Sequence, residues 1–422
     1  MNRLSIVILS ALCLPLSVFG QEAQREELQF LVIEALTRNP EVAAATIQMR
    51  VAERRIPQAS ALDDPQLIFK LMEIPGTNFN QATYANVELM QMIRFPTKLS
   101  KQRDIAVVQA EHAHHDHIEK ELEIVARLKS IYAMLQYARA ALVLNQENQK
   151  LLEQIQSVAT TQYSVGKASQ QEVLKASVEL AKLRAEEASL QQEVITAESM
   201  MKALLNRPAT APIGELEILP VEPLRQPLDT LLHYAAVNRP MLIHDSLTVV
   251  ESGLNLDLMQ QEYLPDLKFS VEYVRMPVVM ENRWSFNAGI TIPFAPWTLS
   301  KASSRVEEAE AQTLVQQSNL QWSRRMVDAL IREAYAKVKA AEFEVNTYEK
   351  TILPQSEQSV RAQLTEYQTG KTAFIMLLDS YRMLRMSKTD AAMARMKHTR
   401  ALATLERNVG VADINVISSS QE

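Results

Sequence analysis

Cysteine, glycine and aromatic residues are all scarce in this sequence. The chain of 422 residues holds one cysteine, eight glycines and 6% aromatic residues. A single cysteine excludes an intramolecular disulfide framework. The shortage of glycine and aromatic residues disfavours an all-β fold, whereas the abundance of alanine, leucine, glutamine and glutamate favours long helices.

Long hydrophobic runs are also missing after the first twenty residues. No later stretch reaches the ~18 uninterrupted apolar residues of a membrane-spanning helix, so any membrane segment is expected to consist of β-strands. The net charge of −6 gives no reason to expect a nucleic-acid partner. The sequence also lacks a glycine-rich phosphate loop, a nucleophile elbow and an HExxH motif, so we expect neither an enzyme nor a bound cofactor.

The first twenty residues have the pattern of an export signal. Arg3 precedes an apolar run at 4–19 and the small Gly20, which predicts a signal peptide at 1–20. The run is too short to span a membrane comfortably. Cys13 lies inside the run and follows Leu12 rather than a small residue, so no lipid anchor is expected.

The chain is predicted to be a tandem duplication. Leu99-Ser100-Lys101 returns as Leu299-Ser300-Lys301, and QYSVGK at 162–167 has a counterpart in EYQTGK at 366–371. Three prolines recur 200 residues later in the chain: Pro40 and Pro240, Pro65 and Pro265, and Pro96 and Pro296. A repeat of this kind implies that one set of structural elements occurs twice.

Each copy is predicted to contain two strands followed by two long helices. The first copy (21–208) has strands at about 66–72 and 84–95 and helices at 97–162 and 169–205. The second copy (228–408) has strands at about 266–274 and 283–294 and helices at 297–369 and 374–407, with a kink near Pro354. A proline-rich linker at 209–227 joins the copies, and 409–422 forms a tail. Helices that reach roughly 100 Å must pair as coiled coils to bury their apolar faces.

The second pair of strands alternates apolar and polar residues with period two. From Trp284 to Ile292 every second side chain is apolar or small, which is typical of a strand in a membrane barrel. Trp284, Phe294 and Trp297 suit an aromatic girdle at the membrane interface. A soluble hairpin with one buried face explains the alternation equally well. Four strands are too few for a closed barrel, since the smallest single-chain barrels have about eight, so a membrane barrel would require a symmetric oligomer.

This layout resembles the outer-membrane efflux protein (TolC) family over essentially the whole chain after residue 20. The likeness depends on the duplicated strand-to-helix junction, at 95–99 and 296–299, and on the duplicated Tyr-x-x-Gly pattern. The resemblance implies a mainly α-helical fold with a small membrane β part, in which a homotrimer forms a 12-stranded β-barrel continuous with an α-helical periplasmic barrel. It also implies a periplasmic adaptor (membrane fusion) protein, an inner-membrane pump of the RND type, and outer-membrane lipid as partners. The residues that would contact the adaptor are Tyr163, Gly166, Lys167, Tyr367, Gly370 and Lys371.

The resemblance also implies a gate at the inner end of the tunnel. Family members often carry acidic side chains six and nine residues after the second glycine, where this chain has Met376 and Asp379. The same spacings in the first copy give Glu172 and Lys175. Because Met376 departs from the pattern, salt bridges are expected to hold the gate less strongly than in other members. An alternative for Asp379 is a solvated carboxylate that stabilises the start of a helix.

The expected function is therefore an outer-membrane exit duct that conducts substrate passively. The sequence around the first pair of strands, with Asp64-Pro65 before the first strand and Met90-Gln91-Met92 before Pro96, resembles that of the branch that serves heavy-metal exporters. Metal cations are therefore the expected substrates. Multidrug efflux and type I protein secretion are alternatives within the same class. A soluble periplasmic coiled-coil scaffold or adaptor without a pore is the alternative of another class.

Two side-chain clusters could bind metal but are interpreted structurally. His112, His114, His115 and His117 have helical spacings that suit Zn²⁺ or Cu²⁺, yet we interpret them as the polar face of a coiled coil and assign no metal site. Methionine is frequent in the last helix, and thioethers suit Cu(I), but we predict core packing for these side chains. They are Met376, Met383, Met386, Met393 and Met396.

Overall fold

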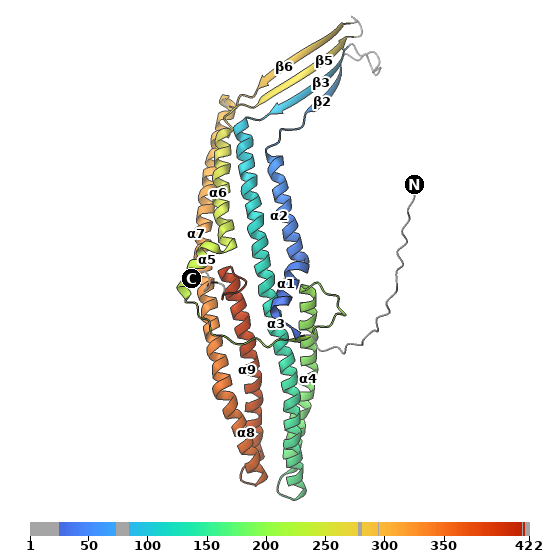
Figure 1. Cartoon of the computed structure of the whole chain (residues 1–422), viewed down its shortest axis with the longest axis vertical. Helices are drawn as coiled ribbons and strands as arrows, with labels where there is room; N and C mark the ends of the chain where they lie inside the picture. The colour runs from blue at the N-terminus through green and yellow to red at the C-terminus, as the bar shows by residue number, and fades with distance from the viewer. Residues whose placement is uncertain (1–24, 73–83, 277–280, 294, 416, 418–422) are drawn as a thin grey trace, which may run out of the picture.

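The computed structural model shows an elongated, mainly helical chain with a sheet at one end and two helical hairpins at the other (Figure 1). It describes residues 25–72, 84–276, 281–293, 295–415 and 417. The predicted signal peptide lies outside these residues. Among the helices that the structure describes, none is both long and apolar enough to cross a membrane.

The two copies contain the same series of elements, as the duplication predicts. The first copy comprises α1 (Leu28–Arg38), α2 (Pro40–Ala59), β2 (Gln66–Met72), β3 (Tyr84–Ile93), α3 (Pro96–Ser164) and α4 (Gln170–Leu204). The second comprises α5 (Leu228–Asn238), α6 (Pro240–Gln261), β5 (Leu267–Met276), β6 (Glu281–Ile290), α7 (Pro296–Thr347), α8 (Leu353–Gln368) and α9 (Phe374–Val409). Two short strands, β1 (Arg25–Glu26) and β4 (Glu215–Leu216), pair in parallel and tie the linker to the start of the described chain. The expected fold class is confirmed: long helical hairpins with four antiparallel strands.

Prolines begin the equivalent helices of both copies. Pro96 and Pro296 lie in the first turns of α3 and α7, and Pro40 and Pro240 in those of α2 and α6. A proline is well suited to this position because its ring presets φ and its missing N–H would have no partner within the helix. The duplicated prolines therefore explain why the helices of the two copies start in register.

A glycine in the left-handed backbone conformation forms the turn of each helical hairpin. Gly166 and Gly370 have φ of 73° and 74°. In each turn the amide of the next residue, Lys167 or Lys371, donates a 2.8 Å hydrogen bond to a carbonyl of the last helical turn. A residue with a side chain adopts this backbone conformation only at a cost, so both tips have the same shape.

The kink expected near Pro354 is a short π-helical turn. Tyr348–Ile352 widens the helix between α7 and α8, and Pro354 lies in the first turn of α8. The proline ring would clash with the carbonyl four residues earlier in a regular helix. One wider turn relieves that clash, so the predicted helix at 297–369 is two segments.

The four long strands form one antiparallel sheet in the order β2-β3-β5-β6, so the central pair joins the two copies. The predicted strands at 84–95 and 283–294 are two to four residues too long at their ends. At β3 the reason is Asp266, whose Oδ1 accepts the Phe95 amide at 2.9 Å and draws this segment out of the ladder just before α3 begins. The bond from the Thr291 amide to the Asp266 carbonyl, at 2.9 Å, continues the β5–β6 register one residue beyond Ile290.

One face of the sheet is apolar and exposed, and the other is polar. A row across all four strands places Leu67, Leu89, Val271 and Phe286 side by side. Phe286 is 78% exposed. The opposite face carries polar contacts, including the Lys70–Glu88 ion pair at 2.5 Å. The chain alone therefore leaves an apolar surface in contact with its surroundings.

Three apolar clusters hold the helices together. One packs α1 against α3 and the end of α4, and a second packs α5 against α7, α9 and three residues after α9, Val411, Ile414 and Ile417. The third lies near the tips and joins the two hairpins through α3, α4, α8 and α9. Between them, the buried ion pair of Lys129 with Glu406 connects α3 to α9 at 2.6 Å.

Candidate functional site

The two hairpins of the chain are packed together close to their tips. Tyr381 of α9 is 1% exposed, and its hydroxyl donates a 3.0 Å hydrogen bond to the Asn148 carbonyl of α3. At the tips themselves, the Gln162 amide donates to the Gln368 carbonyl at 3.0 Å. Both hydrogen bonds join the first copy to the second.

A row of carboxylates on α4 faces the second hairpin. Glu172, Glu179 and Glu186 are seven residues apart, so they lie on one face of the helix. Their partners are the Tyr367 hydroxyl at 2.7 Å, the Arg382 guanidinium, and the Arg385 guanidinium at 3.1 Å. We call these three contacts the inter-hairpin ladder. Separating the hairpins requires breaking all three.

Glu179 is the most buried carboxylate of the ladder. Burial acts to raise the pKa of Glu179, but the hydrogen bond and charge of Arg382 outweigh it and lower that pKa. The carboxylate is thus ionised in the packed hairpins, and its stability depends on Arg382. Removing the guanidinium would leave a largely buried negative charge without its main partner.

Tyr367 differs from its counterpart in the first copy. Tyr163 is 47% exposed at its tip, whereas Tyr367 is 6% exposed and packs against Phe374 with 5.6 Å between ring centroids. Burial and the bond to Glu172 raise the pKa of Tyr367. The ring of Tyr367 thus packs between the hairpins beside the second tip, and its contact with an adaptor remains a prediction.

The other predicted tip and gate residues lie at the exposed end of the molecule. Gly166, Lys167, Gly370 and Lys371 are all exposed in the two turns, and Lys175 is exposed on α4. Asp379 is exposed on α9, with its Oδ1 3.5 Å from Nη1 of Arg382. Met376 is exposed one turn earlier. Glu172, in contrast, is engaged by Tyr367 across the ladder.

The predicted core packing of the α9 methionines is wrong for three of the five. Met376, Met383 and Met386 are 56%, 59% and 60% exposed, while Met393 and Met396 are half-buried. The buried face of α9 is formed by other residues, such as Leu377, Tyr381 and Leu384. Sequence spacing alone did not reveal which of the two faces the methionines occupy.

The histidine cluster forms a seam between α3 and α6. His112 Nε2 lies 3.1 Å from Glu251 Oε2, and its ring meets that of His244 edge-on at 4.4 Å. Burial, followed by the charge of His244, lowers the pKa of His112. On the α2 side, His117 Nε2 lies 3.0 Å from Thr46 Oγ1. Within the part of the chain that the structure describes, no three His, Cys, Asp or Glu side chains are arranged to hold a metal ion.

Comparison with known proteins assigns the chain to a family. A family model described as outer membrane efflux protein matches residues 31–207 and 231–411. The chain belongs to the outer membrane efflux protein family. No curated protein matches the sequence significantly.

Solved structures of similar fold cover almost the whole chain. The channel in a study of CusC folding and transmembrane channel formation is 15% identical, with a TM-score of 0.78 and coverage of 94% of this chain and 96% of that one. The outer-membrane channel OprN is 16% identical (TM-score 0.77; 91% and 89%), and the open state of Neisseria gonorrhoeae MtrE is 17% identical (TM-score 0.75; 91% and 89%). Similar scores for several channels do not separate one branch of the family from another.

As an outer membrane efflux protein, the chain is a non-enzymatic channel of the outer membrane that extends into the periplasm. Channels of this family form homotrimers within tripartite efflux systems. The alternative of a soluble periplasmic scaffold is therefore set aside. The helical hairpins form the periplasmic part, and the ladder lies in it near the hairpin tips.

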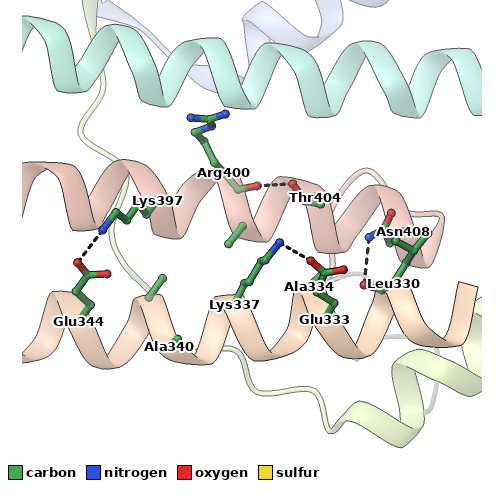
Figure 2. A pocket seen from close by; sticks show the side chains of 12 residues that line it. Leu330, Glu333, Ala334, Lys337, Ala340, Glu344, Lys397, Arg400, Thr404 and Asn408 are labelled. Atoms are coloured by element: carbon green, nitrogen blue, oxygen red, sulfur yellow. Dashed lines mark hydrogen bonds and ion pairs between the residues drawn. The ribbon is translucent and has the colours of Figure 1, made fainter. Parts of the chain in front are cut away.

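Figure 2 shows a groove between α7 and α9 of this efflux protein. Small side chains, among them Ala334 and Ala340, line it, and the Lys397–Glu344 ion pair bridges the two helices at 2.9 Å. Lys337 pairs with Glu333 along α7 at 2.6 Å. Arg400 also lines the groove, and its Nε donates to Ser130 Oγ of α3 at 3.1 Å. The groove is therefore a seam of helix packing.

The inter-hairpin ladder gives a prediction for channel opening. Replacing Arg382 by alanine removes the main partner of Glu179, so we expect the hairpins to separate more readily and the single-channel conductance in planar bilayers to rise. Arg361→Ala is the matched control, because Arg361 is exposed and pairs with Glu357 within α8 at 3.6 Å. If both variants conduct like the wild type, the ladder does not hold the channel closed.

Proposed function

We propose that this efflux protein is the exit duct for heavy-metal cations, handed over by an inner-membrane pump of the RND type through a periplasmic adaptor. The observation that carries the proposal is the exposed carboxylate of Asp379 beside the exposed thioether of Met376 at the inner end of α9. In a threefold assembly these side chains would form rings around the axis. Rings of Asp or Glu favour cations, which agrees with the branch likeness of the strand-to-helix junctions.

The proposed assembly uses both edges of the sheet. β2 and β6 are the edge strands, and in the trimer β6 of one chain pairs with β2 of the next to close a sheet of twelve strands. The apolar row that ends in Phe286 then faces lipid. In this assembly Trp284 (65% exposed) and Trp297 (84% exposed) would lie at the membrane interface. Phe294, the third residue of this predicted girdle, lies outside the described residues.

The proposed gate is at the hairpin tips. Asp379 and Met376 narrow the inner opening, and Glu172 holds it through Tyr367 rather than by facing the channel axis. Lys175 remains a proposed gate residue on the exposed face of α4. The adaptor docks on the two turns, at Tyr163, Gly166, Lys167, Tyr367, Gly370 and Lys371, and its binding strains the ladder until the hairpins separate. The two repeats, 21–208 and 228–408, act as the moving units.

The test is the sensitivity of a deletion strain to copper, silver, zinc and cadmium salts beside a panel of hydrophobic drugs. We expect selective metal sensitivity that the intact gene reverses, because only the duct is missing and the pump cannot deliver its cargo outside. Sensitivity to drugs alone would assign the channel to multidrug efflux. Loss of a secreted protein, with neither sensitivity, would assign it to type I secretion.

A further inference from the structure

We propose that the exposed methionines of α9 form a binding station for soft monovalent cations, Cu(I) or Ag(I), inside the conduit. The proposal rests on the proposed metal-efflux function and adds a ligand class and specificity-determining residues to it. Met376, Asp379, Met383 and Met386 are spaced by three, four and three residues. That spacing places all four on one face of the helix.

The exposure of these side chains separates them from ordinary core methionines. A large apolar side chain that is more than half exposed on a helix gains little from packing within its own chain. On α9 the interior is filled by other residues, including the fully buried Leu377. The three thioethers therefore remain available to a ligand, and sulfur of this kind selects soft cations such as Cu(I).

Met383 and Met386 can reach one ion together. Side chains three residues apart on a helix have Cβ atoms about 5–6 Å from each other, and the unbranched methionine side chain adapts its end position readily. Asp379 lies one turn before Met383 on the same face and supplies negative charge. Met376 lies one turn further toward the tip, so an ion can pass from one thioether to the next.

The basic residues of this part of α9 are all paired with carboxylates. Arg382 is held by Glu179 and Asp379, and Arg385 by Glu186 at 3.1 Å. Lys388 is paired with Glu147 of α3 at 3.2 Å. Arg385 and Lys388 are thus drawn toward α4 and α3, whereas Arg382 is shared between Glu179 of α4 and Asp379 of the stripe. The exposed stripe keeps its three thioethers, and its carboxylate is shared with Arg382.

Weak binding is what a conduit requires. An ion must be held strongly enough to enter and loosely enough to leave, and several weak sites in succession meet both conditions. Two exposed thioethers with a nearby carboxylate form an incomplete ligand set, in contrast to a closed structural metal site. The stripe would therefore favour soft cations in transit without trapping them.

The test is Ag⁺ binding to the detergent-solubilised full-length trimer, measured by calorimetric titration with silver nitrate in chloride-free buffer. The variant is Met376→Leu, Met383→Leu and Met386→Leu combined. Leucine keeps the apolar volume and removes the sulfur, and such swaps are well tolerated even in cores. We expect Ag⁺ binding to weaken by about tenfold or more, which corresponds to ~1.4 kcal/mol.

The matched control replaces three other exposed methionines by leucine: Met200 on α4, Met241 on α6 and Met326 on α7, which are 47%, 40% and 40% exposed. This control should bind Ag⁺ like the wild type. Absence of Ag⁺ binding in the wild type, unchanged binding in the stripe variant, or equal losses in both variants would each overturn the proposal.

The strain test separates this proposal from the proposed function. If the deletion strain is metal-sensitive but the stripe variant restores silver and copper tolerance fully, the methionine station is wrong and metal efflux stands. If the stripe variant loses Ag⁺ binding in vitro while the deletion strain tolerates all metals, metal efflux is wrong although the thioethers bind. Selective failure of the stripe variant with silver and copper, but not zinc, supports both.

Discussion

Phe286→Arg is expected to abolish stable assembly of the channel in the outer membrane. Phe286 lies near the middle of β6, is 78% exposed, and ends the apolar row that begins at Leu67. An arginine on the lipid face costs about 2–4 kcal/mol at the bilayer midplane and less toward the interfaces, and a homotrimer incurs the cost three times. The measurement is the amount of heat-resistant trimer in the outer-membrane fraction.

The control for this prediction lies one residue away on the same strand. Ser285 faces the polar side of the sheet, directly opposite Glu272 of β5. Ser285→Arg adds the same charge on a face where water and the Glu272 carboxylate can stabilise it. The trimer yield should therefore stay near the wild-type value. Equal yields from both variants would show that the apolar face does not contact lipid.

Lys129→Met is expected to destabilise the helical body by about 3–5 kcal/mol, the usual cost of removing one partner from a buried ion pair. Lys129 Nζ lies 2.6 Å from Glu406 Oε2 and donates to the Ala412 carbonyl at 2.7 Å. Glu406 is 3% exposed, and burial raises its pKa although Lys129 opposes this. Without the lysine, a buried carboxylate remains unpaired. The measurement is the thermal stability of the solubilised trimer.

The pH dependence of the Lys129→Met effect has a definite sign. A carboxyl whose pKa is raised by folding destabilises the folded state once the pH rises above its unfolded value. The loss should therefore be largest at neutral and alkaline pH and shrink on acidification, when Glu406 is protonated. Lys337→Met, at an exposed pair within α7, should have little effect at any pH. A pH-independent loss would contradict the ion-pair explanation.

The double variant Lys129→Met with Glu406→Leu tests why the single variant is unstable. The cause is either the loss of the favourable ion pair or the burial of an unpaired Glu406 carboxylate. Replacing both partners of a buried pair by apolar residues of similar size is often neutral or stabilising. We therefore expect the double variant to recover most of the stability that the single variant loses. Failure to recover would mean that other contacts of Lys129, such as that with Ala412, matter more.

Much of the fold could be predicted from the sequence because its signals are local and occur twice. Pro96 and Pro296 fix the starts of the long helices, and Gly166 and Gly370 fix the turns by a backbone conformation that few other residues adopt. The strands of the second copy follow from strict alternation. These features depend on residues close in the chain, so they can be read without tertiary structure.

The site was less predictable because its contacts join distant parts of the chain. Nothing near Tyr367 indicates that Glu172, 195 residues earlier, will bind its hydroxyl. His244 likewise meets His112 only because α6 packs against α3. The methionines of α9 have the same periodicity whether they face the core or the exterior, so spacing could not assign their face. The exact ends of β3 depended on one side chain, Asp266, from the other copy.

The long-range contacts between the two copies can form only after most of the chain has been synthesised. Lys129 and Glu406 are 277 residues apart, and Tyr381 meets Asn148 across 233 residues. Contacts this distant form late, because the intervening chain must first be ordered. A chain that emerges N-terminus first therefore passes through an interval in which α3 has no α9 and β3 has an unpaired edge. An unpaired edge invites aggregation, so the half-made chain is most prone to aggregate during this interval.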